Sequence, residues 1–196
     1  MQTALAKKIS LILAPLVVVI PATFVVSYFG TRNIVLSLEW MLVSLVFILL
    51  LMAPLVIFVK KGHFSDLDVS VQKQRPWLFL IEFIFTLAYF SVMYFFHAPK
   101  ELFLGIITIF VLLIVFGIVN KFIKASGHLG MLSAIVMLFV FMGGWVYLPG
   151  FVLIPILAWS RIRLKKHSLQ EVLAGVVIGI SVVIFIIVIF LLLSGS

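Results

Sequence analysis

The sequence has no cysteine, so disulfide bonds and metal sites built from thiolates are excluded. Charged residues are also scarce, at 10% of the 196 residues, whereas average globular chains carry roughly a quarter. Hydrophobic residues make up 65% of the chain, which is more apolar surface than so few charges can cover in water. These shortages exclude a soluble globular domain and predict an integral membrane protein.

Acidic residues are the scarcest charged class, with 6 Asp and Glu against 14 Lys and Arg, for a net charge of +8. A basic balance of this kind favours contact with anionic membrane lipids or with a phosphate-bearing substrate. Nucleic-acid binding is not expected, because it needs an exposed basic face and little of this chain lies outside the bilayer.

Long apolar runs predict an all-α fold, a polytopic bundle of transmembrane helices, since about 20 residues of helix cross the hydrocarbon of a bilayer. The candidate spans are residues 9–29, 35–59, 77–96, 102–122, 129–146, 151–160 with its flanks, and 169–193. The sixth run is short and contains Pro155, so either six or seven spans are expected. No repeat or linker divides the chain, and residues 1–196 are expected to form a single domain.

Polar residues between the spans are concentrated in three rich segments, at 60–76, 121–128 and 160–171, while the lean connections include a "YLPG" turn at 147–150. Two spans separate each rich segment from the next, so all three are expected on the same side of the membrane as the N-terminus. Twelve of the fourteen Lys and Arg lie on that side, with only Arg32 and Lys100 on the other. The positive-inside tendency predicts that the rich side is cytoplasmic, with the plasma membrane as the location.

Side chains suited to phosphate binding are gathered in the rich segments. Arg75 and Arg161 can each clamp a phosphate with two N–H groups, because the guanidinium fork matches its oxygens. Ser126 and Gly127 stand where a helix is expected to begin, and helix N-termini offer free N–H groups to anions. Together these groups predict an anion site at one membrane face.

The rich segments also hold two histidines, which permits a division of labour. One imidazole can attack phosphorus while the other donates a proton to the leaving oxygen. His167 and Glu171 are four residues apart and share a helical face, so the carboxylate can fix the imidazole in one tautomer. His128 is the second imidazole, and Lys73 and Lys124 can add positive charge. These residues predict phosphate chemistry at the membrane surface.

Three short motifs occupy the rich segments: "QKQRP" ending at Pro76, "ASGH" at 125–128 and "SRIRLKKH" at 160–167. They resemble the first, second and third signatures of the type 2 phosphatidic acid phosphatase family, in that order and with two spans between neighbours. The matched core covers about residues 66–179.

The resemblance implies a metal-independent lipid phosphatase that needs no cofactor and works through a phosphohistidine. Its substrate would be a lipid phosphomonoester or diphosphate, such as a polyprenyl phosphate, phosphatidic acid or phosphatidylglycerol phosphate. By resemblance, His167 is the nucleophile and His128 the general acid. The residues expected to bind the phosphoryl oxygens are Arg75, Arg161, Ser126 and Gly127.

Three positions depart from the family pattern. Asp68 stands where the first signature has lysine, and Lys73 or Lys124 is expected to supply the missing charge. Ala125 replaces the usual proline, and Glu171 replaces the aspartate that partners the nucleophile. These departures leave open a non-hydrolytic relative, either a lipid phosphotransferase or a headgroup binder. A transporter is less favoured, because the spans hold almost no ionisable groups.

Two further acidic features need an interpretation. Asp66 and Asp68 form a D-x-D pair, which is more typical of a solvated loop than of a metal site, and no metal is expected. Glu82 falls near the start of the third candidate span, where a carboxylate is a functional candidate. Either it braces a basic residue of the site or its role is structural.

Overall fold

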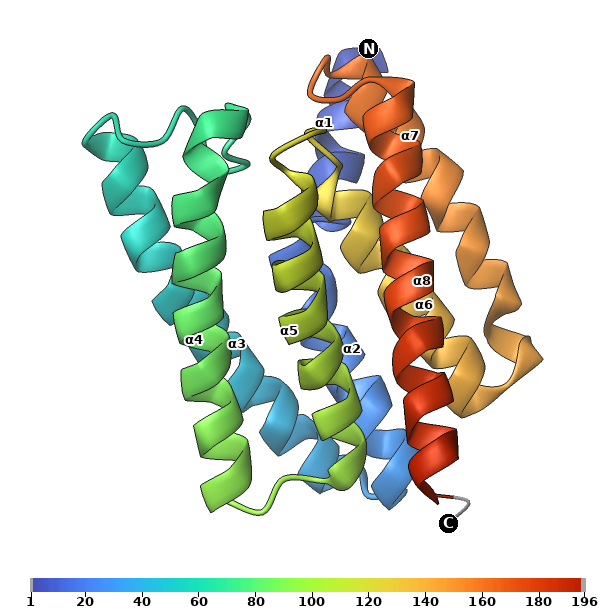
Figure 1. The fold of residues 1–196 in the computed structure, drawn as a ribbon. Helices are drawn as coiled ribbons and strands as arrows, with labels where there is room; N and C mark the ends of the chain where they lie inside the picture. The colour runs from blue at the N-terminus through green and yellow to red at the C-terminus, as the bar shows by residue number, and fades with distance from the viewer. Residues whose placement is uncertain (1, 195–196) are drawn as a thin grey trace.

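The computed structural model describes residues 2–194, and all the regular structure in this range is helical. The helices in chain order are α1 (Gln2–Ile12), α2 (Pro15–Thr31), α3 (Ile34–Lys60), η1 (Gln72–Gln74), α4 (Arg75–Phe95), α5 (Lys100–Val119), α6 (Gly127–Gly143), η2 (Trp145–Val152), α7 (Leu153–Arg163) and α8 (Leu169–Ser194). Figure 1 shows them as one bundle, with the N-terminus and the three polar-rich loops at the same end. The all-α polytopic bundle expected from the sequence is confirmed.

Within residues 2–194, five helical segments are long and apolar enough to cross a membrane, and the bent pair α1–α2 makes a sixth when it is counted as one span. Two of the five include a 3-10 helix, since η1 continues into α4 and η2 into α7. A seventh crossing depends on α6, a shorter apolar helix of 17 residues, which is the lower limit of the usual range. Figure 1 shows α6 running from one end of the bundle toward the other, beside α8.

The first candidate span is broken. α1 ends at Ile12 and α2 begins at Pro15, and the two axes are bent by 46°. Pro15 has no backbone N–H, and its ring holds Ala14 in an extended conformation with φ −66° and ψ 145°, so the helix cannot continue through this point. The break allows α1 to pack along α7, on the side of the site.

The "YLPG" segment differs from the turn expected from the sequence, because it lies inside the 3-10 helix η2. α6 stops at Gly144, whose φ of 83° only glycine adopts readily. Pro149 is compatible with the helix that follows, since its fixed φ near −65° falls within the 3-10 range. η2 and α7 together therefore return the chain to the end where the site lies.

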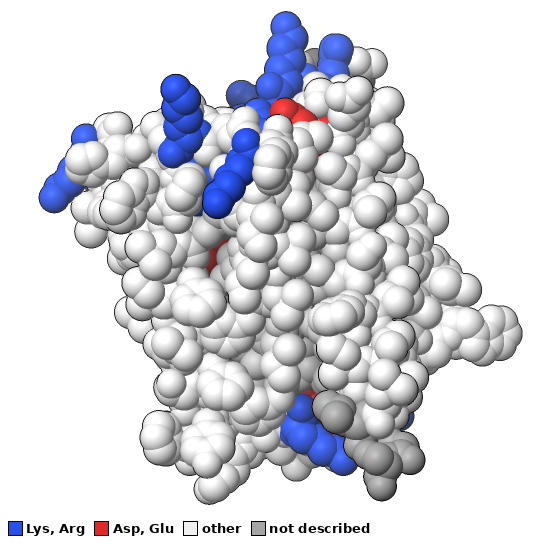
Figure 2. All heavy atoms as spheres, in the orientation of Figure 1, with Lys and Arg blue, Asp and Glu red and all other residues white. Residues whose placement is uncertain are grey.

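The outer surface between the two ends is apolar. Figure 2 shows Lys and Arg gathered at the ends of the bundle, with a broad band between them that is white apart from a small recessed red area. Large hydrophobic side chains in this band are well exposed, among them Leu49, Ile84 and Ile118. An exposed apolar belt of this kind is suited to lipid rather than water.

Close packing of α6 against α8 sets the position of the second polar loop. A Cβ atom added to Gly175 would overlap the carbonyl oxygen of Ser126, and one added to Gly179 would overlap that of Gly130. Small residues therefore let the two helix backbones approach closely, as is common between membrane helices. The backbone N–H of Ser126 also donates to the carbonyl oxygen of Glu171 at 2.9 Å, which ties the start of α6 to the start of α8.

Candidate functional site

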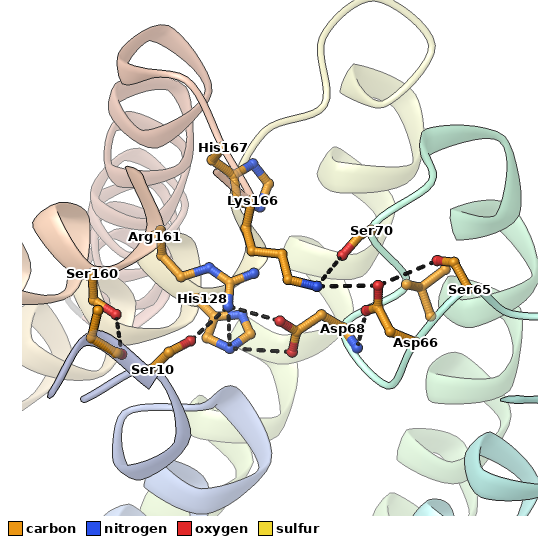
Figure 3. Close-up of polar contacts among 12 residues, drawn as sticks. Ser10, Ser65, Asp66, Asp68, Ser70, His128, Ser160, Arg161, Lys166 and His167 are labelled. Carbon is orange, nitrogen blue, oxygen red and sulfur yellow. Dashed lines mark hydrogen bonds and ion pairs between the residues drawn. The ribbon is translucent and has the colours of Figure 1, made fainter. Parts of the chain in front are cut away.

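The three polar-rich loops meet at one end of the bundle, where Figure 3 shows Asp68 of the first loop, His128 at the start of α6 and Arg161 at the end of α7 directed toward one another. The loops are residues 61–71 after α3, 120–126 between α5 and α6, and 164–168 between α7 and α8. A cavity of about 250 Å³ opens between them. The polar or helix-terminal residues that line it at this end are Asp68, Arg75, Gly127, His128, Arg161 and His167.

His167 is held by the first turn of α8. Its Nδ1 lies 2.9 Å from Oε2 of Glu171, and the same oxygen accepts a hydrogen bond from the backbone N–H of Ser168 at 3.1 Å. The N–H of Glu171 donates in return to Oγ of Ser168 at 3.3 Å, which completes a capping box. The sequence "SLQE" thus starts a helix and places a carboxylate behind the imidazole at the same time.

The His167 imidazole is neutral at neutral pH. Burial, and then the positive charges of Arg75, Arg161 and Lys124, lower its pKa to about 3. A neutral imidazole carries one N–H, and the carboxylate of Glu171 is the acceptor beside Nδ1. The lone pair is then on Nε2, which faces Nη2 of Arg75 at 3.5 Å. An unprotonated ring nitrogen on a cavity wall is suited to nucleophilic attack.

Arg75 is the first residue of α4 and joins the first two polar loops. Its Nη1 donates to the carbonyl oxygen of Ala125 at 2.8 Å, and its Nε donates to the carbonyl oxygen of Val69 at 3.2 Å. These bonds leave Nη2 directed toward His167. Nε and Nη1 of the guanidinium therefore hold the two loops together, while Nη2 faces His167 on the cavity wall.

Arg161 is in the last turn of α7 and is almost fully buried, with 2% exposure. Its Nη1 donates to Oγ of Ser10 at 2.7 Å and to Oδ2 of Asp68 at 2.8 Å, and lies 3.4 Å from Nε2 of His128. Its Nε is buried and has no partner within the described part of the chain. Nη2 takes part in none of these bonds, and a guanidinium group that lines a cavity is suited to bind an anionic ligand there.

His128 and the start of α6 form another wall. His128 is the second residue of the helix and is buried, and Gly127 before it also lines the cavity. The first N–H groups of a helix have no intrahelical acceptor and carry the positive end of the helix dipole. Ser126 stands at the N-cap, but its hydroxyl is fully buried, has no hydrogen-bond partner among residues 2–194, and does not line the cavity. The backbone at Gly127, rather than the Ser126 side chain, faces the site.

Lys124 and Lys73, the two lysines expected to supply positive charge, differ in their distance from the site. Nζ of Lys124 donates to the carbonyl oxygen of Lys166 at 2.9 Å and lies 3.8 Å from Oε2 of Glu171. This places its charge behind His167 rather than on the cavity wall. Lys73 is exposed and does not line the cavity. The structure therefore leaves Lys73 outside the group that the other predicted residues form.

Asp68 is the site residue to which sequence reasoning gave no role. Its Oδ1 lies 3.8 Å from Nε2 of His128, in addition to the bond from Arg161. Burial raises the pKa of Asp68, but the charges of Arg161 and His128 outweigh it, and the pKa lies below its ordinary value of 3.8. The one feature of the sequence that could have pointed to Asp68 was its position in the first motif. Ser10, the other partner of Arg161, is one serine in an apolar run, and nothing in the sequence marks it as a site residue.

The cavity continues from the polar end into the bundle, where its wall is mostly apolar. This part is lined by residues of α2 to α6 that include Leu16, Leu55, Phe79, Leu112, Phe116 and Met131. Glu82 also lies on this wall, two turns along α4 from Arg75. A second cavity of about 120 Å³ shares Leu16, Glu82 and Met131 with the first and extends further along the bundle.

No group of three or more His, Asp or Glu side chains able to hold a metal ion occurs within residues 2–194. The polar end of the cavity is instead rich in N–H donors, from two guanidinium groups and a helix N-terminus, which lie beside two imidazoles. Such a donor set is suited to an anion with several oxygens, of which phosphate is the commonest in biology.

Comparison of the chain with protein families, with curated proteins and with solved structures found no match.

Proposed function

We propose that the protein is a membrane phosphatase that removes phosphate from an amphipathic lipid, as a distant relative of the type 2 phosphatidic acid phosphatase family. One observation carries the proposal. A single cavity is lined by His128, His167, Arg75 and Arg161, which come from four helical segments or loops, and its wall further into the bundle is mostly apolar. A phosphate group with a hydrocarbon chain has this same division into an anionic end and an apolar end.

The phosphoryl group would lie between the two guanidinium groups and the N-terminus of α6. Nε2 of His167 attacks phosphorus, forming a P–N bond while the bond to the lipid oxygen breaks. The negative charges of the bound phosphate and of Asp68 favour the imidazolium form of His128, which donates a proton to that oxygen and becomes neutral, so the lipid leaves as a neutral alcohol. The charge that develops on the phosphoryl oxygens is stabilised by the N–H donors already aimed at that space.

The second half of the reaction restores the enzyme. A water molecule attacks the phosphohistidine, and His128, now without its proton, accepts one from the water. The P–N bond breaks, inorganic phosphate leaves, and His167 regains its neutral imidazole with Nδ1–H directed at Glu171. Each step uses only groups that line the cavity or contact those that do.

The placement of the site also suits a lipid substrate. It lies at the end of the bundle that carries twelve of the fourteen Lys and Arg, where a headgroup would meet the protein. The proposal puts this end on the cytoplasmic side of the plasma membrane, following the positive-inside tendency. The apolar wall below it would receive the part of the chain nearest to the phosphate.

The test is phosphate release in detergent micelles from dodecyl phosphate, phosphatidic acid and a polyprenyl phosphate, with and without EDTA. The native protein is expected to release phosphate in EDTA, and His167→Asn is expected to release none while keeping its melting temperature. A phosphoenzyme that is labile in acid and stable in base would identify the phosphohistidine. Absence of release from every lipid would overturn the proposal, and transfer only to an added alcohol would make the protein a phosphotransferase instead.

A further inference from the structure

Asp68 is held inside the anion site by its own loop. Figure 3 shows its carboxylate directed at Arg161 and His128, with contacts of 2.8 Å and 3.8 Å. Its backbone N–H donates to Oδ1 of Asp66 at 2.9 Å, and Oδ2 of Asp66 accepts from Nζ of Lys166 at 3.1 Å. The Asp68 carboxylate is therefore held in a fixed position in the wall of the cavity.

Val69, the residue after Asp68, also helps to fix the position of the loop. Val69 is fully buried, and its carbonyl oxygen accepts the hydrogen bond from Nε of Arg75. Its φ of 44° is rare for a β-branched residue, which is found there only when its surroundings enforce it. The unusual backbone conformation of the loop at Val69 thus directly follows Asp68, the residue that the loop places on the cavity wall.

The carboxylate is on the side of the site where a leaving group departs. His128 would protonate the leaving oxygen, and Asp68 is the acidic residue that contacts it. On Arg161, Nη1 serves Asp68 and Ser10, whereas Nη2 takes part in neither bond and remains for the phosphoryl oxygens. The phosphoryl group and the carboxylate therefore use different edges of one guanidinium.

Resting on the proposed function, we infer that Asp68 makes the site selective for lipid phosphomonoesters against lipid diphosphates. When a monoester reacts, the leaving group is an alcohol without charge. When a diphosphate reacts at its terminal phosphorus, the leaving group is itself a phosphate, and its charge would lie beside the carboxylate. Like charges a few ångströms apart in a partly buried site repel strongly, and such repulsion is an effective way to reject one of two related ligands.

Asp68 stays ionised in the pH range where the discrimination matters, since its pKa lies below the ordinary value. The position is also where the family resemblance would place a lysine. A lysine there would attract a second phosphate, whereas the aspartate repels it. Replacing a positive charge by a negative one at position 68 would therefore change the preferred headgroup from a diphosphate to a monophosphate.

The experiment compares farnesyl phosphate with farnesyl diphosphate, which share one chain, and separates the products so that only the first cleavage is scored. The native protein is expected to prefer the monoester by about tenfold or more in kcat/KM. Asp68→Asn is expected to bring the ratio close to one, mainly through faster cleavage of the diphosphate. Asp66→Asn removes a carboxylate from the same loop, while its amide oxygen can still accept from the backbone N–H of Asp68, and it is expected to keep the native ratio.

Two outcomes would overturn the inference: equal or better use of the diphosphate by the native protein, or an unchanged ratio in Asp68→Asn. If that variant does not fold, the native protein can be tested with two inhibitors, farnesyl phosphonate and farnesyl methylenediphosphonate. Stronger inhibition by the monophosphonate is expected, and stronger inhibition by the diphosphonate would contradict the inference. Release of no phosphate from either substrate would count against the proposed function, so the two failures are distinguishable.

Discussion

The carboxylate of Glu171 contacts the imidazole of His167 at 2.9 Å with the same oxygen that caps α8. One side chain therefore begins a membrane helix and sets the tautomer of the proposed nucleophile. Because the cap is fixed by backbone geometry, the imidazole is oriented by the helix itself. The longer side chain of glutamate, compared with aspartate, reaches back over one helical turn to do this.

Glu171→Gln separates the two roles of this side chain. The amide oxygen can still accept from the backbone N–H of Ser168, so the melting temperature is expected to change little. The negative charge behind His167 is lost, and kcat is expected to fall by about 10²–10⁴. Ser168→Ala is the matched control, which is expected to lose about 1 kcal/mol of stability while kcat changes little. The reverse pattern would show that Glu171 acts only as a cap.

Arg161→Lys tests whether the fork of the guanidinium is needed. One ammonium group cannot serve Ser10, Asp68 and the phosphoryl oxygens together. The expected result is a decrease in kcat/KM by about 10²–10³, measured as phosphate release at low substrate. Arg163→Lys, at an exposed position two residues away, is expected to behave as the native protein. Native activity in Arg161→Lys would remove this arginine from the mechanism.

Gly175→Ala tests the contact that positions the start of α6. The added methyl group would overlap the carbonyl oxygen of Ser126, so the helices must separate. A loss of about 1–3 kcal/mol is expected, with loss of activity because the helix N-terminus moves away from the cavity. Gly105→Ala is the control, since its Cβ would meet no atom within 4 Å and alanine favours helix. Thermal unfolding in detergent measures both variants.

Acid is expected to destabilise the protein through His167. The folded-state pKa is about 3 and the ordinary value is 6.5, so below pH 6.5 the unfolded chain binds a proton that the folded chain does not. Stability is therefore lost progressively as the pH falls from 6.5 toward 3. Asp68 adds to the loss only at the acid end, as the pH falls through its lowered folded-state pKa.

His167→Gln is the variant that isolates this effect, because glutamine does not titrate in this range. Its melting temperature is expected to change less than that of the native protein between pH 7 and pH 4.5. The measurement is thermal unfolding in one detergent across a buffer series at constant ionic strength. Parallel curves for the two proteins would mean that His167 is not the group responsible.

Much of the fold was predictable because hydrophobicity is a local property of the chain. Runs of about 20 apolar residues predict spans wherever they occur, and the even number of spans between polar loops places those loops on one side. Local geometry was harder to predict. The break at Pro15 and the 3-10 helix through Pro149 both depend on how a proline is accommodated by the neighbouring backbone.

The sequence by itself determined the class of the protein, its helical character, and which polar loops share one end of the bundle, since these follow from composition, the length of apolar runs and the number of spans between the loops. Only the tertiary structure decided which edge of each guanidinium is free, that Lys73 lies outside the site, and that Asp68 lies within it. Asp68 and Arg161 are 93 residues apart in the chain. The distance between their side chains depends on the packing of several helices and on the path of one loop, which no local pattern encodes.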